Sequence, residues 1–323
     1  MIRGLMLTDA LAYVSFRKRA PVNEAIANPG GTTTQLGLVH LMGRSALPDP
    51  TRFTWVAIDR GQISGLVSVR NRLFADIWDI DQLVAIPDEG QSRTYVDLLD
   101  HLVSSAYAEG VQRLFLRANA DSAAEQASRQ VGFCRYTSES VHVLDRSALP
   151  PPTRQLRLRP RRPIDHQPLF QLYVSAVPAR VRQIEGMTLR EWRATDGWRL
   201  YPMDWRVGLP LNRRDFIIED NGAVAAWVQF EPRTSVLRLL SSPSSNVDFG
   251  QVISEVLRHF RRISKIVIPI RDYQEPIRNY LENTGVEPVA NHSLLSRSLA
   301  VRVVEPRLLR GWREGVPVRE AGM

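Results

Sequence analysis

The stretch "IDQLVAIPDEGQSRTYVDLLDHL", residues 80–102, decides how the whole chain is interpreted. A β-rich run from Ile80 to Ile86 ends at Pro87, and a polar loop follows. Apolar residues then recur at helical spacing, at Tyr95, Leu98, Leu99, Leu102 and Ala106. The pattern predicts a strand, a loop and a helix N-terminus. The free N–H groups and the dipole of a helix N-terminus favour an anion, so this loop is a candidate phosphate site.

Length and composition favour an ordinary globular protein of about two domains. The chain has 323 residues, 44% hydrophobic and 24% charged. It contains no run of about 18 apolar residues, so we expect no membrane span. The first residues, "MIRGLMLTDALAYV", lack a small-residue cleavage site, and we expect mature protein rather than a signal peptide. Cys134, the single cysteine, fits a reducing cytoplasm and is expected to be a buried strand residue.

The positive charge suggests a nucleic-acid partner, but the distribution of basic residues argues against one. The net charge is +8, yet among 42 basic residues only Lys18 and Lys265 are lysine, and the arginines are spread along the chain. No zinc-finger spacing or RNA-binding aromatic motif accompanies them. The six histidines show no metal-ligand spacing. We therefore expect no nucleic acid, no membrane and no metal, and the oligomeric state stays open.

The chain repeats one order of elements on either side of a predicted linker, "DRSALPPPTRQ", residues 145–155. Each side has a hairpin, a strand ending at a proline, an amphipathic helix, a buried strand, a helix ending at a glycine, and final strands. The matching pairs Gly61 and Gly222, Pro87 and Pro243, and Gly132 and Gly285 lie 161, 156 and 153 positions apart.

These slowly drifting intervals indicate a tandem duplication of an α+β unit of roughly 150 residues. We predict domains at residues 1–144 and 156–304, followed by a basic tail at 305–323.

This order of elements resembles that of the GNAT superfamily of acyl-CoA N-acyltransferases, here with two domains in tandem, a layout similar to that of mycothiol synthases. The matching residues are Leu83, Val84 and Ala85 before the loop, and Gly132-Phe133 after the last helix. The resemblance implies an α+β fold in which a mixed twisted sheet is flanked by helices in each half. It also implies acetyl-CoA or another acyl-CoA as co-substrate and a small-molecule amine as acceptor.

In the family, the pantetheine pairs with the fourth strand and the pyrophosphate lies on a glycine-rich helix N-terminus. This chain departs from that loop: Arg93 and Tyr95 occupy the glycine places, Gly90 occupies the arginine place, and Asp248 stands in the second copy. The resemblance implies cofactor-binding residues Leu83, Val84, Ala85, Gly90, Gln91, Ser92, Arg93, Thr94, Ser244, Asn246 and Gly250. Arg93 would replace glycine contacts with a charged hydrogen bond, while Tyr95 turns into the core. The alternative is an ordinary helix N-cap.

The candidate catalytic residues are Asp81 as base and Tyr280 as acid. Asp79 and Asp81 share one face of a strand, and Asp81 falls where the family often places its base. The alternative for Asp81 is a solvated strand end. Tyr280 is one residue off the family spacing, which rotates it by about 100° on a helix, so a core-edge role is its alternative. Ser128 occupies the tyrosine place of the first copy.

Neither half has a complete set of the catalytic and phosphate-binding residues that the family resemblance implies, and two hypotheses follow. The first is an acyl-CoA-dependent N-acyltransferase with degenerate pyrophosphate loops. The second is a catalytically inactive GNAT-fold protein that binds a small ligand or a partner. The segment "REWRATDGWRLYPMDWR", residues 190–206, would shape an acceptor pocket for an aromatic or anionic amine, or simply pack its tryptophans on the core.

Overall fold

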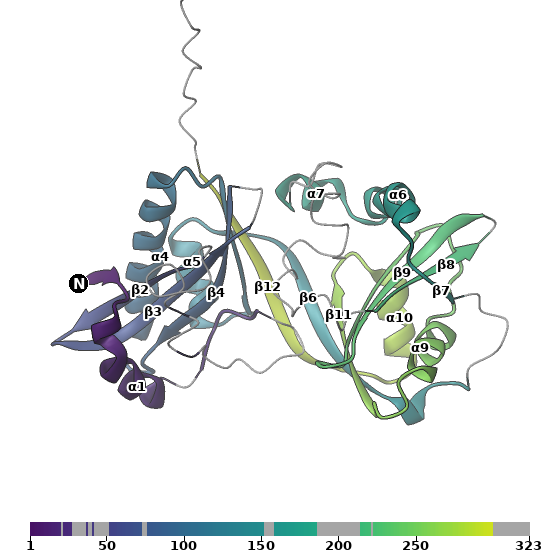
Figure 1. Ribbon diagram of the computed structural model, residues 1–323, viewed down its shortest axis with the longest axis horizontal. Helices are drawn as coiled ribbons and strands as arrows, with labels where there is room; N and C mark the ends of the chain where they lie inside the picture. The colour runs from purple at the N-terminus through teal and green to yellow at the C-terminus, as the bar shows by residue number, and fades with distance from the viewer. Residues whose placement is uncertain are drawn as a thin grey trace, which may run out of the picture.

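The computed structural model describes residues 1–20, 22–27, 37, 41, 52–72, 76–151, 158–185, 214–220 and 222–299. Twelve described strands form one continuous mixed sheet, with helices on both of its faces (Figure 1). The α+β class predicted from the sequence is confirmed. Among the described residues, no helix combines the length and the apolar character needed to cross a membrane.

The described elements of the two halves follow the same order, except that α7 of the second half has no described counterpart in the first. The first half has β1 (Ile2–Gly4), α1 (Ala10–Arg19), β2 (Arg52–Asp59), β3 (Gln62–Asn71), β4 (Ile77–Ala85), α4 (Gln91–Ala108), β5 (Arg113–Asn119), α5 (Ala123–Gln130) and β6 (Cys134–Asp145). The second half has β7 (Leu158–Pro160), α6 (His166–Ala176), α7 (Ala179–Glu185), β8 (Arg214–Asp220), β9 (Ala223–Glu231), β10 (Val236–Ser241), α9 (Phe249–Arg258), β11 (Lys265–Arg271), α10 (Glu275–Asn283) and β12 (Pro288–Ser298).

Matching positions of the two halves have matching conformations. Gly61 turns the β2–β3 hairpin with φ +78°, and Gly222 turns the β8–β9 hairpin with φ +79°. A left-handed φ suits glycine because it has no Cβ to clash. Gly132 follows α5 and Gly285 follows α10 in the same way. The predicted duplication is therefore present in the backbone as well as in the sequence.

Each half begins with an ion pair between an arginine and an aspartate, which we call the arginine–aspartate clamp. The guanidinium of Arg3 donates two hydrogen bonds of 2.7 Å to Asp9, and that of Arg159 donates two of 2.8 Å to Asp165. In each half the same aspartate also accepts a bond from a main-chain N–H three residues earlier, at 2.8 Å and 2.6 Å. The aspartate thus fixes the chain between the first strand and the first helix, and both clamps lie at the same place in the repeat.

The last strands of the two halves are exchanged. The strand order is β1-β2-β3-β4-β5-β12-β6-β11-β10-β9-β8-β7, so β12 pairs with β5 of the first half and β6 pairs with β11 of the second. Strands β6 and β12 also pair with each other, and Figure 1 shows them side by side at the centre of the molecule. The predicted domain limits stay predictions, but the sheet itself runs across them.

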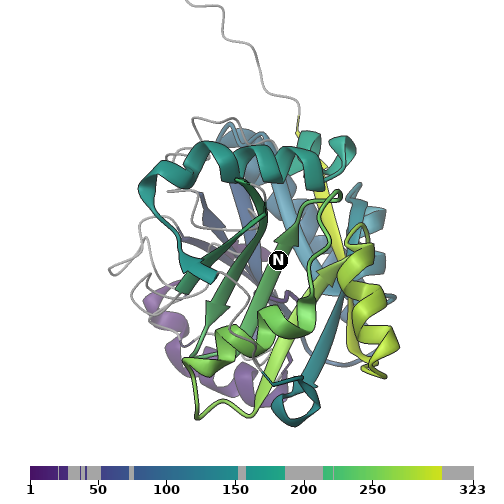
Figure 2. The same cartoon turned by 90° about the vertical axis from the view of Figure 1, so that its right-hand side faces the viewer.

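Alternate strand residues supply the two faces of the sheet. On one face of the second half, α9 and α10 pack on Val228 and Leu239; on the other, α6 and α7 pack on Trp227 and Leu240. Figure 2 views the molecule from the side where this half lies, with the teal α6 and the yellow-green α10 on different sides of the strands.

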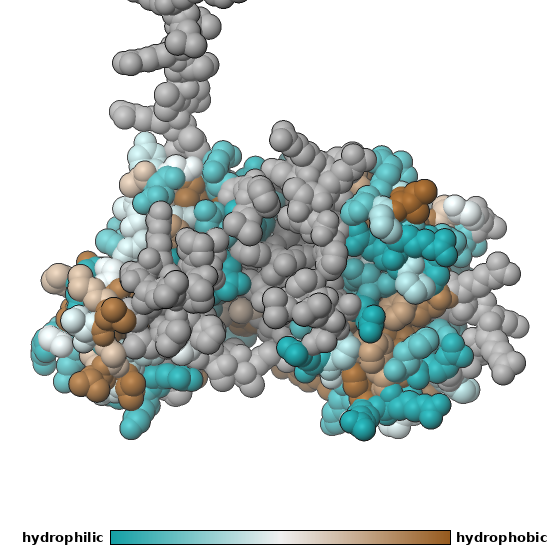
Figure 3. Space-filling view, in the orientation of Figure 1, coloured by the Kyte–Doolittle hydropathy of each residue, from teal (hydrophilic) through white to brown (hydrophobic). Residues whose placement is uncertain are grey.

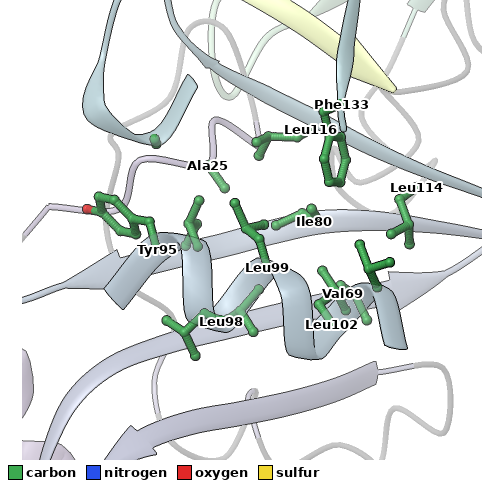
Figure 4. Close-up of a cluster of buried hydrophobic side chains, with 14 of the residues drawn as sticks. Ala25, Val69, Ile80, Tyr95, Leu98, Leu99, Leu102, Leu114, Leu116 and Phe133 are labelled. Carbon is green, nitrogen blue, oxygen red and sulfur yellow. The ribbon is translucent and has the colours of Figure 1, made fainter. Parts of the chain in front are cut away.

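In the first half, α4 and α5 cover one face and α1 the other. Figure 4 shows the helical stripe of α4 against the strands, with the ring of Tyr95 turned inward. Tyr95 is fully buried, as its place in the apolar stripe predicted.

The exposure of the single cysteine differs from the sequence prediction. Cys134 is exposed at the start of β6, so the prediction of a buried strand residue is wrong. Cys134 is the first residue of β6, and although its main chain pairs with Ser296 of β12, its side chain is not covered at this end of the strand. Exposed apolar side chains gather on the first helical segment, where Leu7 and Leu11 are 63% and 87% exposed. Figure 3 shows apolar surface at the end of the molecule where α1 lies.

Candidate functional site

Strands β4 and β5 separate after a short parallel contact, which creates the first opening in the sheet. Their pairing covers only residues 77–79 of β4 and 113–115 of β5. A bulge follows at once, because Ser68 pairs with Gln82 while Val69 pairs with Ile80, leaving Asp81 as the extra residue. Apolar residues facing α4 are spaced by two on each side of the bulge and by three across it, at Trp78, Ile80, Leu83 and Ala85.

The first opening is filled by the protein's own residues 22–26. The main-chain N–H of Glu24 donates to the Leu83 carbonyl at 2.9 Å, and that of Ile26 donates to the Arg117 carbonyl of β5 at 2.8 Å. This segment therefore bridges β4 and β5 where the two strands no longer pair. It takes the place that the family resemblance gives to the pantetheine.

Asn23 holds this segment with its side chain. Its Oδ1 accepts the Leu83 N–H at 2.8 Å, and its Nδ2 donates to the Asp81 carbonyl at 2.9 Å. The side chain is buried, with only 2% of the residue exposed. Both main-chain groups of Leu83 are thus satisfied within the protein, and the main chain of Ala85 hydrogen-bonds to the Tyr95 hydroxyl. Acyl-CoA can pair with Leu83 only if residues 22–26 leave.

Asp81 lies in a buried ion pair rather than at a solvated strand end, so that alternative is wrong. Its two carboxylate oxygens lie 2.8 Å and 2.6 Å from the two terminal nitrogens of Arg52, and Asp81 is only 3% exposed. Asp79 is paired in the same manner with Arg72, at 2.7 Å. A general base needs a free oxygen within reach of the proton it takes. The catalytic role of Asp81 stays a prediction that requires Arg52 to release it.

The loop before α4 is capped by a carboxylate. Asp88 accepts the Gly90 N–H at 2.9 Å, at the place where an anion would approach the helix. Ser92 and Arg93 point their side chains into solvent, and Gln91 donates to the Tyr95 hydroxyl at 3.3 Å. The remaining predicted positions serve packing: Thr94 lies against Gly65, and Val84 belongs to the apolar cluster under α1.

In the matching opening of the second half, no described main-chain segment takes the place that residues 22–26 have in the first. Strands β10 and β11 pair only at Val236 and Val267. Ala179, 156 positions after Asn23, begins α7, and this helix packs over the central strands instead of entering the opening. In the described part of the chain, the Gln274 side chain bridges β10 and β11 beyond that pair. Gln274 donates from Nε2 to the Leu239 carbonyl at 2.6 Å and accepts the Arg271 N–H at 2.9 Å.

The N-terminus of α9 is also capped from within. Asp248 accepts the Gln251 N–H at 3.1 Å, so its charge lies at the helix N-terminus to which the family resemblance assigns the pyrophosphate. The predicted residues Ser244 and Asn246 are exposed beside it. Gly250 faces protein, because a Cβ there would lie 2.8 Å from the Tyr280 hydroxyl and 3.1 Å from Pro150. Close packing thus explains this glycine without a ligand.

Tyr280 lies between α10 and the start of α9. Its ring centroid is 6.1 Å from that of Phe249. Burial, and secondarily the charge of Asp248, raises the pKa of the Tyr280 hydroxyl, which keeps it protonated at neutral pH. This position fits the core-edge alternative, and the role as acid stays a prediction. Ser128, at the corresponding place in the first half, is fully buried and donates to the Ala124 carbonyl at 2.6 Å.

The residues that local sequence patterns missed are those that fill the first opening. Asn23 follows a helix in a segment without periodicity, and Arg52 lies 29 positions from its partner Asp81. The described residues contain no group of histidine, cysteine, aspartate and glutamate side chains arranged to hold a metal. The tryptophan-rich segment 190–206 lies outside the described residues, so its predicted role is untested.

Comparison with solved structures assigns the fold. A tandem GNAT protein from the clavulanic acid biosynthesis pathway is 15% identical, with a TM-score of 0.53, over 92% of this chain and 98% of that one. A GCN5-related N-acetyltransferase from Sphaerobacter thermophilus is 13% identical, with a TM-score of 0.54, over 92% and 95% of the two chains. No protein-family profile and no curated protein sequence matches. The chain therefore has the GNAT fold in tandem, as its sequence predicted.

Proposed function

We propose that this protein is an acyl-CoA-dependent N-acyltransferase that holds acyl-CoA in its second half, between β10 and β11. The observation that carries the proposal is the difference between the two openings. Residues 22–26 occupy the first opening through hydrogen bonds to both strands, whereas the matching residues of the second half form α7. Among the described residues, the Gln274 side chain crosses the second opening, and a side chain moves aside more readily than a main-chain segment.

The main chain of β10 offers groups that could bind acyl-CoA and hold the oxyanion of acyl transfer. The Leu239 carbonyl faces the opening, and by strand alternation Ser241 faces it as well. Their main-chain groups can pair with the pantetheine amides, and an N–H can hold the oxyanion that forms when an amine attacks the thioester carbonyl. The amine nitrogen forms a C–N bond with the thioester carbon, the C–S bond then breaks, and the proton that the amine loses passes to the departing thiolate, which gives the free thiol of CoA. The acceptor would be a small-molecule amine, as the fold resemblance implies.

A second candidate is binding without acyl transfer. Strand β10, with the sequence "VLRLLS", carries no carboxylate that could act as base. The carboxylate in the first half, Asp81, has both oxygens engaged by Arg52. These two observations favour a protein that keeps a ligand-binding opening and has lost turnover. The two candidates differ in one measurable product, the free thiol of CoA.

Calorimetry with acetyl-CoA tests the proposal. Wild-type protein should bind, and Asp248→Asn should bind about two- to fivefold more tightly, because asparagine keeps the helix cap and removes a like charge near the pyrophosphate. Arg93→Ala is the matched variant in the first half and should bind like the wild type. Loss of affinity in Arg93→Ala would instead place acyl-CoA in the first half, as a modified phosphate cradle.

The outcomes separate the candidates. Absence of binding by the wild type would reject an acyl-CoA site in either half. Binding together with thiol release in the presence of an amine panel supports the acyltransferase. Binding without thiol release from any amine in the panel would favour the second candidate.

A further inference from the structure

The pairing of β6 with β12 is symmetric about one residue pair, Glu139 and His292. These two residues are opposite each other in the sheet. They also match in the repeat, because they lie 153 positions apart, as Gly132 and Gly285 do. Moving outward, Ser138 faces Ser293 and Ser140 faces Asn291, and a register shift occurs toward each end of the ladder. The two halves are therefore related by a local two-fold axis that passes between Glu139 and His292.

The outer neighbours of the two central strands obey the same symmetry. Asn119 of β5 faces His292, and Arg271 of β11 faces Glu139. The two ladders contain seven paired positions each and begin at matching ends, Arg113 with Ser298 and Lys265 with Asp145. The backbone alone would therefore allow either half to pair in the same register with a second copy of itself.

The side chains on the axis break this symmetry. His292 Nδ1 lies 3.4 Å from Glu139 Oε1, and Glu139 Oε2 lies 3.3 Å from Arg117 Nη2 and 3.8 Å from Arg271 Nε. The side chains of all four residues are at most 4% exposed. The Glu139 carboxylate thus lies among the side chains of Arg117, Arg271 and His292. Of these, His292 is the residue of the second half that matches Glu139 in the repeat.

If the first half paired with a second copy of itself, the contact between Glu139 and His292 would be replaced by a contact between two glutamates. The symmetric register would bring Glu139 against Glu139 of a second copy, so that two buried carboxylates face each other at the axis. Each Glu139 would keep Arg117 of a first half nearby but would lose His292 and Arg271, which belong to the second half, while the two like charges repel each other. The existing pair instead places His292 Nδ1 against a carboxylate oxygen, and in the tautomer that carries its proton on Nδ1 the ring donates to Glu139 without any like charge.

We propose that Glu139 and His292 determine which partner the central strands accept, so that the first half pairs with the second half and not with another copy of itself. The interface consists of β12 against the edge of β5 and of β6 against the edge of β11. Its partner is the unlike half of the same chain. Each half is then a specific binding partner for the other, independent of the peptide link between them.

The test cuts the link in the complete protein. Residues 152–157 are replaced by a protease recognition sequence, and the purified chain is cleaved. The two fragments of the otherwise wild-type chain should co-elute in gel filtration as one complex of one copy each, and should unfold in a single thermal transition. Separation of the fragments, or formation of complexes of like fragments, would overturn the proposal.

Variants on the axis test the role of the residue pair. His292→Glu in the cleavable chain should weaken association of the fragments at least about 100-fold, the scale of breaking a buried charge pair. His292→Gln, which keeps a donor, should retain the complex. Adding Glu139→Gln to His292→Glu should restore association, which also shows that the strand with glutamate at 292 can fold. Unchanged association in His292→Glu, or no recovery in the double variant, would refute the assignment.

Discussion

At the scale of single residues, Gly65 shows how closely α4 approaches the sheet. A Cβ at this position would lie 2.5 Å from Thr94 Cγ2 and 2.9 Å from Leu98 Cδ1. The first helical turn of α4 could not keep its place without a shift of the packed core. We expect Gly65→Ala to lower the free energy of unfolding by about 1–3 kcal/mol through overpacking. Gly4→Ala, where a Cβ would meet nothing within 4 Å, serves as control in the same urea titration.

The buried pair of Arg52 and Asp81 leads to a second prediction. Arg52→Met leaves a buried carboxylate without its cation and should cost about 3–5 kcal/mol of stability. Replacing both residues, by Arg52→Met with Asp81→Leu, removes the uncompensated charge and should cost clearly less. Chemical denaturation of the three proteins checks this order. Equal losses in the single and double variants would mean that charge pairing is not what holds the two strands at this point.

The sequence predicted the position of a side chain where neighbouring residues along the chain determine it. It did not predict contacts between residues that are far apart in the sequence. Tyr95 was placed in the core because its own helical stripe carries that information. The partner of Asp81 could not be found in the same way, since strand register alone brings Arg52 to it. A period of two along β4 also fails at the bulge, which no local pattern announces. For the same reason, the filling of the first opening by Asn23 had no signal in the sequence.

At the scale of elements, the two arginine–aspartate clamps predict a shared pH dependence. Hydrogen bonding to Arg3 lowers the pKa of Asp9, and that to Arg159 lowers the pKa of Asp165. A carboxyl group with a lowered folded-state pKa stabilises the fold above its unfolded value of 3.8, and that stability is lost as the pH falls through the folded value.

Asp9→Asn and Asp165→Asn should therefore each destabilise the protein near pH 7, with a difference from wild type that shrinks below about pH 4. Urea midpoints measured from pH 7 to pH 3 test this. Asp100→Asn, which changes an exposed carboxylate on α4, is the control and should show no such convergence. A difference that stays constant over the whole range would show that the clamps act by packing rather than by charge.

The order of elements in each half was predicted, but the exchange of the last strands was not. Patterns along β6 and β12 tell which side chains face a core, since this depends on alternation within one strand. They do not tell which strand edge accepts the pairing, because β5 and β11 offer equivalent edges in equivalent halves. Only the complete sheet distinguishes pairing within a half from pairing between halves.

At the scale of the whole molecule, the net charge of +8 raises the question of nucleic acid again. Many described arginines are engaged inside the protein, as Arg52, Arg117 and Arg271 are with buried carboxylates. We therefore expect no measurable binding of generic double-stranded DNA at physiological salt in a polarisation assay. A micromolar complex whose affinity falls steeply with added salt would contradict this, since counterion release marks phosphate contacts.

The exchanged strands also set an order of events during synthesis. Strand β5 ends at Asn119, but its partner β12 begins only at Pro288, roughly 170 residues later. At about 5–20 residues per second, a ribosome takes about 10–30 s to supply it. Once α5 and β6 have followed β5, the nascent first half has its other described elements, yet β5 still lacks the partner that it has in the folded sheet. An unpaired edge recruits other chains, so the protein depends on remaining dilute or protected until its final strand emerges.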